Sequence, residues 1–455
     1  MPQKKIFVSV LIPTFIQTLL ITTAPDRSLL FIMSTKQPNQ LFSNFISLSI
    51  VQGTNFLLPL LVMPYVISKI GADGFGIVAV AQLVMIYCSV ISDYGFNLTA
   101  SRDIALYQEE PLRTSQLFFT VLATRLLITA FLLVVLLLAA AFIPVVKDHF
   151  ILYMLGFTYV VGQSLIVSWF FQGKQKMHFI TLSTFIARLV FVLLVFVFIH
   201  VKEDGKYFLF FLGSGNIIAG LFSIFLAIRM FHLKYIPPVW TGILYELKEG
   251  WPIMVSNLSI STSMYSGVFI LRIFTNDLVV GYYSIAERIF FAARQVLSVF
   301  SQAIYPHVCQ LSQKSKAIAR AFFQKFYLPF LLLVLAGSTI LCILSPQIIS
   351  VFLRTAPVLP VLILRMLSFV PVIVCLNIPA YQLLLAFDRK KSILVIFGLA
   401  TVINITINIL LAKNWGAAGT ALSVIITELL ITTSLQQQLF QNKLAGYVKP
   451  EHGTE

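Results

Sequence analysis

Charged residues are scarce in this chain, and acidic residues are the scarcest. Only 11% of the 455 residues are charged, whereas soluble domains have about 25%. Together with a hydrophobic fraction of 58%, this excludes a soluble globular protein. Lys and Arg outnumber Asp and Glu by 32 to 17, but they recur in short groups between apolar segments and form no basic stripe. A nucleic-acid-binding protein is therefore not expected.

Cysteine and the motifs of catalysis are also scarce. The sequence has no Walker loop, no HExxH and no GxSxG motif, and its six histidines are scattered. The loops between the apolar segments are short, which argues against a membrane glycosyltransferase or a glycan polymerase. The cysteines lie in apolar segments and form no CxxC pair: Cys88, Cys309, Cys342 and Cys375. We predict buried free thiols, no enzymatic activity and no bound cofactor.

Long apolar segments are what the chain has in abundance. A helix needs about 20 apolar residues to cross the hydrocarbon core of a bilayer. The sequence predicts twelve such spans: Leu41–Ile67, Ile77–Ala100, Ser115–Ile143, Phe150–Phe171, Met177–Ile199, Tyr207–Met230, Trp251–Phe274, Val280–Pro306, Ala321–Leu344, Val358–Phe387, Ser392–Ala412 and Ala417–Phe440. We therefore expect an all-α polytopic membrane protein.

Basic residues divide unevenly between the two sets of loops that join these spans. The loops of one set hold 17 Lys and Arg residues, and those of the other set hold six: Lys69, Lys147, Lys202, Lys206, Arg354 and Lys413. Because cytoplasmic loops are enriched in Lys and Arg, the richer set is predicted to face the cytoplasm. With an even number of spans, both termini are then cytoplasmic.

The first 40 residues do not fit this orientation. Residues 6–24 are apolar and follow two lysines, as in the core of a signal peptide, but a thirteenth span would reverse the sidedness. Met33 precedes a polar stretch and suits a true start. We predict that residues 1–40 are an extension without function or a misassigned start. A surface-lying or cleaved segment and a real span are the alternatives.

Six predicted spans lie on either side of one polar loop. The sequence predicts an N-terminal bundle over residues 41–231, a cytoplasmic linker over 232–250, a C-terminal bundle over 251–440 and a cytoplasmic tail over 441–455. The turn before span two ends in Gly76, and a similar turn before span eight ends in Gly281. This echo indicates a parallel repeat of two six-helix bundles around a central cavity. The alternative is that short turns rich in Gly and Asp resemble one another anywhere.

Several arginines lie inside the predicted spans, where a charge near the bilayer centre costs at least ~2.5–3.5 kcal/mol. Five of them are candidates for a cationic cavity that binds an anionic substrate: Arg125, Arg188, Arg288, Arg294 and Arg365. Arginine suits phosphate because its planar fork donates two parallel hydrogen bonds. The alternative is that each pairs with a helix-end carbonyl or a carboxylate and fixes packing. Arg272, near an outer span end, can reach the interface.

Acidic residues inside the spans are few. Asp93 lies near the cytoplasmic end of span two, where we expect it to pair with Arg102. Glu287 and Glu428 are candidates for coupling transport to an H⁺ or Na⁺ gradient, because a desolvated carboxylate binds a proton more readily. Drive by the membrane potential is equally open.

Five short motifs are similar to those of one family. They are Ile70-Gly71-Ala72-Asp73-Gly74-Phe75-Gly76, Asp93-Tyr94-Gly95-Phe96, Ala100-Ser101-Arg102-Asp103-Ile104-Ala105, Trp169-Phe170-Phe171-Gln172-Gly173 and Val280-Gly281-Tyr282-Tyr283-Ser284-Ile285-Ala286-Glu287-Arg288. Over residues 41–440 the chain resembles the bacterial polysaccharide-export flippases of the O-antigen transporter type. These belong to the multidrug/oligosaccharidyl-lipid/polysaccharide (MOP) transporter superfamily.

The resemblance implies a transporter of the bacterial inner membrane. Its substrate would be an undecaprenyl-pyrophosphate-linked oligosaccharide unit, carried from the cytoplasmic to the periplasmic leaflet by alternating access for O-antigen, capsule or exopolysaccharide synthesis. Its partners would be membrane lipids, a glycan polymerase and glycosyltransferases. The alternative is a drug or cation antiporter of the same superfamily, which should show carboxylates rather than arginines in its cavity.

Overall fold

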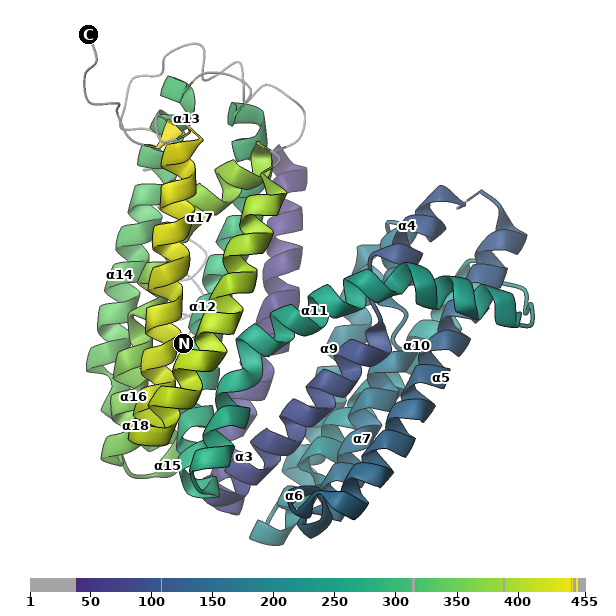
Figure 1. Cartoon of the computed structure of the whole chain (residues 1–455). Coiled ribbons are helices and arrows are strands. Elements are labelled where there is room, and N and C mark those ends of the chain that lie inside the picture. Colours follow the sequence, from purple (N-terminus) through teal and green to yellow (C-terminus); the bar gives the residue numbers. More distant parts are fainter. Residues whose placement is uncertain are drawn as a thin grey trace, which may run out of the picture. The chain divides into compact units, whose positions relative to one another are not determined.

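A computed structural model describes residues 38–107, 109–312, 316–387, 389–442, 444 and 447–448 of the chain. Every regular element in these residues is helical (Figure 1). In chain order the first half contains α3 (Pro38–Asp93), α4 (Thr99–Leu106), α5 (Pro111–Phe142), α6 (Pro144–Asp148), α7 (Phe150–Leu165), α8 (Ser168–Gly173), α9 (Met177–Phe198), η1 (Lys202–Tyr207) and α10 (Phe208–Met230). The second half contains α11 (Trp240–Phe274), α12 (Asp277–Ser312), α13 (Lys316–Phe322), η2 (Phe323–Tyr327), α14 (Leu328–Ile343), α15 (Ser345–Leu353), α16 (Val358–Ser368), α17 (Val370–Ala386) and α18 (Lys390–Gln441).

By its internal contacts the chain divides into two compact units, Met1–Ser49 and Ile50–Glu455. All the cavities and contacts considered for function lie in the second unit. The prediction for residues 1–40 falls almost entirely outside the described residues, as does that for most of the tail over 441–455. The boundary between two six-helix bundles at residues 232–250 stays a prediction.

The described helices are long and apolar enough for a polytopic membrane protein. Eight of them satisfy the length and hydropathy of a membrane span, or nine if the pair Trp240–Thr262 and Met264–Phe274, bent by 55° within α11, is one span. The all-α membrane fold is thereby confirmed. Each of the twelve predicted segments is helical over most of its length, but the number of crossings stays a prediction.

Two of the long helices are each broken at a glycine, so each of them corresponds to two predicted spans; α12, which covers span eight, is not among the helices that satisfy the test. α3 contains Gly71 at φ 78°, and α18 contains Gly416 at φ 54°. Both values lie in the left-handed region that glycine adopts without steric cost. At 1.5 Å of rise per residue, the 51-residue stretch Lys391–Gln441 would be about 75 Å long, more than twice the hydrocarbon thickness. Each glycine therefore marks a turn between two predicted spans.

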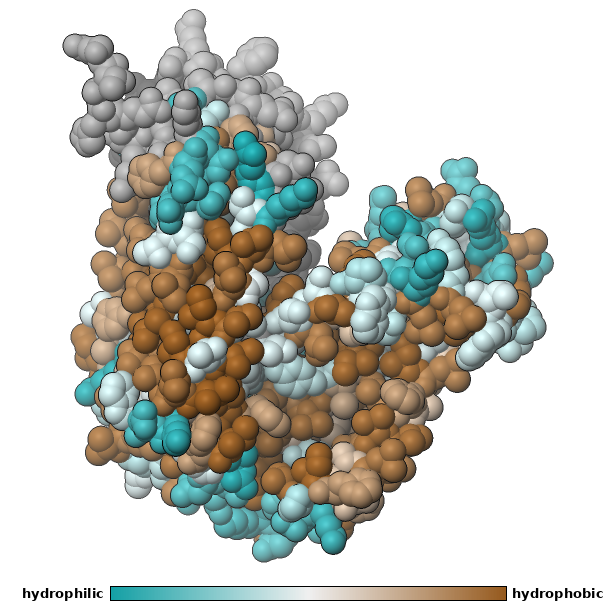
Figure 2. Space-filling model, in the orientation of Figure 1, coloured by the Kyte–Doolittle hydropathy of each residue, from teal (hydrophilic) through white to brown (hydrophobic). Residues whose placement is uncertain are grey.

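Large apolar side chains cover the outside of the helices. On the strongly apolar helix α5, for example, Phe142 is 82% exposed and Phe131 is 66% exposed. Figure 2 shows hydrophobic residues over the middle of the helices and hydrophilic residues gathered towards their ends. In water such a surface would be unfavourable, whereas lipid chains solvate it.

The buried apolar residues form three clusters. The first, here called the shared core, joins residues of both halves, for example Met63 and Phe75 of α3 with Leu271 of α11 and Tyr283 of α12. The second contains only residues of the second half, such as Leu297 and Leu383. The third contains only residues of the first half and is aromatic, with Phe118 and the Trp169-Phe170-Phe171 motif. The two halves are therefore continuous at the shared core and have separate cores elsewhere.

Candidate functional site

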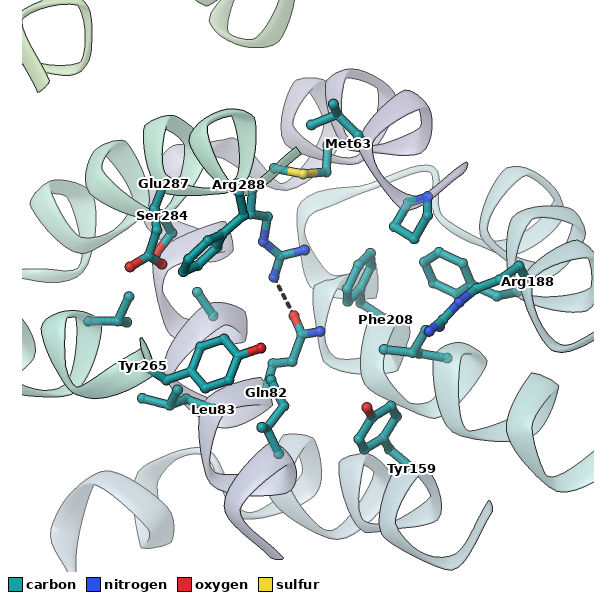
Figure 3. Close-up of a pocket in the computed structure, with 18 residues that line it drawn as sticks. Met63, Gln82, Leu83, Tyr159, Arg188, Phe208, Tyr265, Ser284, Glu287 and Arg288 are labelled. Carbon is teal, nitrogen blue, oxygen red and sulfur yellow. Dashed lines mark hydrogen bonds between the residues drawn. The ribbon is translucent and has the colours of Figure 1, made fainter. Parts of the chain in front are cut away.

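One cavity brings two of the predicted arginines together. It has a volume of about 370 Å³ and is called here the arginine cavity. Arg188 of α9 and Arg288 of α12 line it, together with Gln82 of α3, Tyr159 of α7 and Tyr265 of α11. Figure 3 shows the two arginines entering from opposite sides, with Phe208 between them. A cavity with two cationic side chains and aromatic walls is suited to an anionic group attached to a larger ligand.

Arg288 is held by groups from the other half of the chain. Its Nη2 donates a hydrogen bond to Oε1 of Gln82, and its guanidinium lies 4.9 Å from the ring centre of Phe75. Both partners belong to α3, whereas Arg288 belongs to α12. These contacts keep the guanidinium in the cavity and, at the same time, connect the two halves.

Two further residues of α12 line the same cavity. Ser284 lies one helical turn before Arg288, and Glu287 directly precedes it. Ser284 is 2% exposed, and its hydroxyl has no hydrogen-bond partner in the part of the chain that the structure describes. Glu287 is 8% exposed and also lines a further cavity, which contains Arg294. The unpartnered hydroxyl leaves a donor and an acceptor for a ligand.

Arg125 lies elsewhere, in a buried network at the end of α7. Its Nη2 is 3.1 Å from Oδ1 of Asp93, and its Nη1 and Nη2 donate to the carbonyl oxygens of Ile166 (2.8 Å) and Gln163 (2.9 Å). These carbonyls lie where α7 ends and the chain breaks before α8. That of Gln163 accepts from the N–H of Ile166 at 3.3 Å, while the N–H of Val167, its usual helical partner, donates to Ser223 instead. The arginine therefore completes the end of a helix, as the packing alternative proposed.

The pairing predicted between Asp93 and Arg102 is wrong. Asp93 contacts Arg125, and its second oxygen accepts a hydrogen bond from Asn97 at 2.6 Å. Arg102 instead lies 3.0 Å from Asp103 and 4.0 Å from Glu249. Arg125 is 32 residues from Asp93 in the sequence and lies on another predicted span, but the packing of α5 against α7 and the end of α3 brings the two together.

Replacing Arg125 with methionine is expected to lower the free energy of unfolding by about 3–5 kcal/mol, because Asp93 is left as an unpaired, partly buried charge. The double variant Arg125→Met with Asp93→Asn should recover part of this loss. The measurement is unfolding in mixed detergent micelles with increasing sodium dodecyl sulfate. An unchanged midpoint for Arg125→Met would show that the network does not stabilise the fold.

Arg294 and Glu428 pair with each other in the second half. Nη1 of Arg294 is 2.9 Å from Oε1 of Glu428, whose side chain is 8% exposed. The pair lines a cavity of about 430 Å³ between α11, α12 and α18, called here the C-terminal cavity. Glu428 had no visible partner in the sequence, since α12 and α18 are distant in the chain. Its charge is balanced here by Arg294.

The remaining two arginines lie apart from these cavities. Arg365 is exposed and donates a hydrogen bond from Nε to the hydroxyl of Ser345 at 3.1 Å. Arg272 is 2.9 Å from Asp277 and donates to the carbonyl of Thr275, so it joins α11 to the start of α12. The single cavity predicted for five arginines is therefore divided: Arg188 and Arg288 share one site, and Arg125, Arg294 and Arg365 occupy three others.

A second polar cavity has a volume of about 360 Å³. It is called here the amide cavity, because Asn97, Gln163 and Asn257 line it together with Asp93 and Arg125. Tyr159 and Ile86 line both this cavity and the arginine cavity, so the two adjoin. Gln82 and Tyr159, which line the arginine cavity, were not foreseen from the sequence. The only sequence signal for them is a polar residue on an otherwise apolar helix.

Comparisons with known proteins agree with this architecture. The model of a family described as polysaccharide biosynthesis protein matches residues 41–312, more than half of the chain. A protein of Escherichia coli (strain K12) named "Putative O-antigen transporter" is 27% identical over 402 residues, which cover 88% of this chain and 97% of that protein. A protein of the same name from Shigella dysenteriae is 27% identical over 391 residues, with 85% and 97% covered.

Solved structures share the fold at lower identity. An inward-facing multidrug resistance MATE family transporter of the MOP superfamily has a TM-score of 0.69 at 15% identity, covering 88% of this chain and 98% of its own. The lipid II flippase MurJ in an inward closed conformation has a TM-score of 0.66 at 14% identity, covering 90% and 89%. The family match covers more than half of the chain, and the relatives and the shared multi-helix membrane fold agree with it: the chain belongs to the polysaccharide biosynthesis protein family.

Proposed function

We propose that the protein turns undecaprenyl-pyrophosphate-linked oligosaccharide units from the cytoplasmic to the periplasmic leaflet of the inner membrane by alternating access. The observation that carries this proposal is the convergence of Arg188 and Arg288, one from each half, on a single cavity. The names of the bacterial relatives and of the lipid II flippase support the substrate class.

The chemistry of the arginine cavity favours a diphosphate. Each guanidinium can donate two parallel hydrogen bonds to phosphate oxygens, and its charge is only weakly hydrated compared with an ammonium group. A diphosphate has enough oxygens to bridge two arginines that enter from opposite sides. Because Arg188 and Arg288 belong to different halves, a bound diphosphate would draw the halves together around it.

The distribution of buried clusters supports alternating access. At one end of the molecule the shared core joins α3 of the first half to α11 and α12 of the second. Towards the other end the two halves have separate cores. With the predicted orientation, the joined end faces the periplasm. In this state the two halves would be closed against each other on the periplasmic side and free to separate on the cytoplasmic side. Rocking of the two halves about the arginine cavity would open the periplasmic end and close the cytoplasmic end.

The remaining assignments follow from this function. We place both termini in the cytoplasm, from the 17-to-6 division of basic residues, and we assign no catalytic activity. Glu287 and Glu428 are proposed to couple transport to an H⁺ or Na⁺ gradient. Glu287 lines two cavities. The carboxylate of Glu428 pairs with Arg294 and could bind a proton or a sodium ion in its place. A glycan polymerase and glycosyltransferases are the proposed protein partners.

Export of cationic drugs is the second candidate function. The MATE transporter with the same fold and the carboxylate of Glu287 in the arginine cavity favour it. Two arginines in that cavity oppose it, because they repel a cation. The lining therefore favours the glycan substrate.

Reconstitution in lipid vesicles distinguishes the two functions. Vesicles would contain the purified chain and an undecaprenyl-pyrophosphate-linked oligosaccharide, and a lectin added outside would report how much glycan becomes accessible. A parallel set would contain a cationic dye such as ethidium. We expect glycan translocation without dye transport. Dye transport without glycan translocation would reverse the assignment.

A further inference from the structure

The amide cavity differs in charge from the arginine cavity that adjoins it. Asp93 and Arg125 are the charged residues that line it, and they neutralise each other at 3.1 Å. Both are already engaged, since Arg125 donates to two backbone carbonyls and Asp93 accepts from Asn97. A diphosphate would find no free positive charge there, so this cavity is unsuited to the group that the arginine cavity favours.

The remaining polar side chains suit hydroxyl groups. Asn97, Gln163 and Asn257 carry amides, and Ser168 and Ser261 carry hydroxyls. Each of these groups can both donate and accept hydrogen bonds, as a sugar hydroxyl does. The volume of about 360 Å³ is within the range of small-ligand sites. The lining is thus polar, uncharged in sum and able to bond from several directions.

Both halves of the chain contribute to the amide cavity. Asn97, Gln163 and Ser168 come from the first half, whereas Asn257 and Ser261 lie one helical turn apart on α11 of the second. Tyr159 stands at the boundary: it lines both cavities, and its hydroxyl accepts a hydrogen bond from Gln163 at 3.3 Å. A ligand longer than one cavity would therefore pass Tyr159.

We propose that the amide cavity is a separate subsite for the uncharged sugar next to the diphosphate, and that Tyr159 sets the spacing between the two groups. This assignment rests on the proposed function, because it needs a substrate in which a sugar is joined to a diphosphate. The arginine cavity then recognises the part common to all such substrates. The amide cavity recognises the part that differs between glycans, so Asn257 and Ser261 contribute to selectivity.

Binding of two matched probes to the full chain in lipid nanodiscs tests the assignment. The first probe is farnesyl diphosphate, and the second is farnesyl diphosphate that carries one N-acetylglucosamine. In the wild-type chain we expect the sugar-bearing probe to bind about 10-fold more tightly, which corresponds to a few net hydrogen bonds. The double variant Asn257→Leu with Ser261→Leu should lose this preference and retain its affinity for farnesyl diphosphate.

Two controls define the outcome. Ser259→Leu makes the same change on the same helix, but Ser259 lines the C-terminal cavity, so the preference should persist. Arg188→Gln should weaken both probes alike. Equal affinity of the wild-type chain for both probes, or a double variant that keeps the preference, would overturn the subsite while leaving diphosphate binding intact. Failure of the wild-type chain to bind either probe would overturn the proposed function as well.

Discussion

Replacing both Arg188 and Arg288 with glutamine is expected to slow glycan translocation about 100-fold or more. Hydrogen bonds to charged groups contribute about 1.5–3 kcal/mol each, and a factor of ten in rate corresponds to about 1.4 kcal/mol. Two arginines that each lose one such interaction therefore give at least this reduction. Each single variant should fall about 10-fold. The measurement is the initial rate of lectin accessibility in reconstituted vesicles.

Lysine at the same positions should restore only part of the rate. It keeps the positive charge but cannot make the two parallel bonds of a guanidinium. Arg365→Gln is the matched control, because Arg365 is exposed and hydrogen-bonded to Ser345, away from the arginine cavity. Its rate should stay within about two-fold of the wild type, as for a surface substitution of small effect on the fold.

Arg288 also joins the two halves, so a loss of rate has to be separated from a loss of that contact. Gln82→Leu removes the hydrogen-bond partner on α3 and leaves both arginines in place. If the arginines act by binding, Gln82→Leu should be much faster than the double arginine variant. If the two are equally slow, Arg288 acts by connecting α12 to α3. A well-folded double variant that works at the wild-type rate would remove the basis for a diphosphate site.

The membrane fold could be predicted because lipid imposes a simple requirement on sequence. Each span must be about 20 apolar residues long and helical, and basic loops alternate with neutral ones. Breaks inside spans were harder to predict. α7 ends at Leu165 without a glycine or proline at the break, and the signal for it lies in Arg125 on another helix.

Side-chain partners could not be predicted, because they depend on which faces of distant helices meet. Glu428 lies on α18 and its partner Arg294 on α12. The sequence indicates how deep a residue lies in the membrane. Many residues share the same depth, however, and depth does not specify which neighbouring helix a side chain faces. The sequence could therefore single out the five arginines, while their division among different sites required the three-dimensional packing.

A single methyl group at Gly281 is expected to prevent closure of the end that contains the shared core. A Cβ added there would lie 1.8 Å from the carbonyl oxygen of Ala72, and a Cβ on Gly76 would lie 2.0 Å from that of Asp277. Close contacts between carbon and a carbonyl oxygen are about 3.3 Å or longer, so α3 and α12 would have to separate by more than about 1 Å. Backbone atoms form both contacts, so no side chain can move aside.

The two glycines are the ones that end the matching turns before spans two and eight. Their mutual contact supports a seal between equivalent parts of the two predicted repeats, at the end predicted to face the periplasm. Gly281→Ala should therefore favour the state open to the outside. A chain that cannot close this end cannot complete the cycle, so glycan translocation should fall at least about 10-fold.

Accessibility of the arginine cavity measures the change directly. Ser284 is 2% exposed and lines this cavity, so a Ser284→Cys substitution in a chain without its four native cysteines reports on opening. A membrane-impermeant maleimide added on the periplasmic side should label it about 10-fold faster when Gly281→Ala is present. Gly337→Ala is the matched control, because a Cβ at Gly337 meets no atom within 4 Å. In an exposed helix this change is, if anything, stabilising. Equal labelling of the two alanine variants, with normal translocation by Gly281→Ala, would mean that the contact between Gly76 and Gly281 does not close the path.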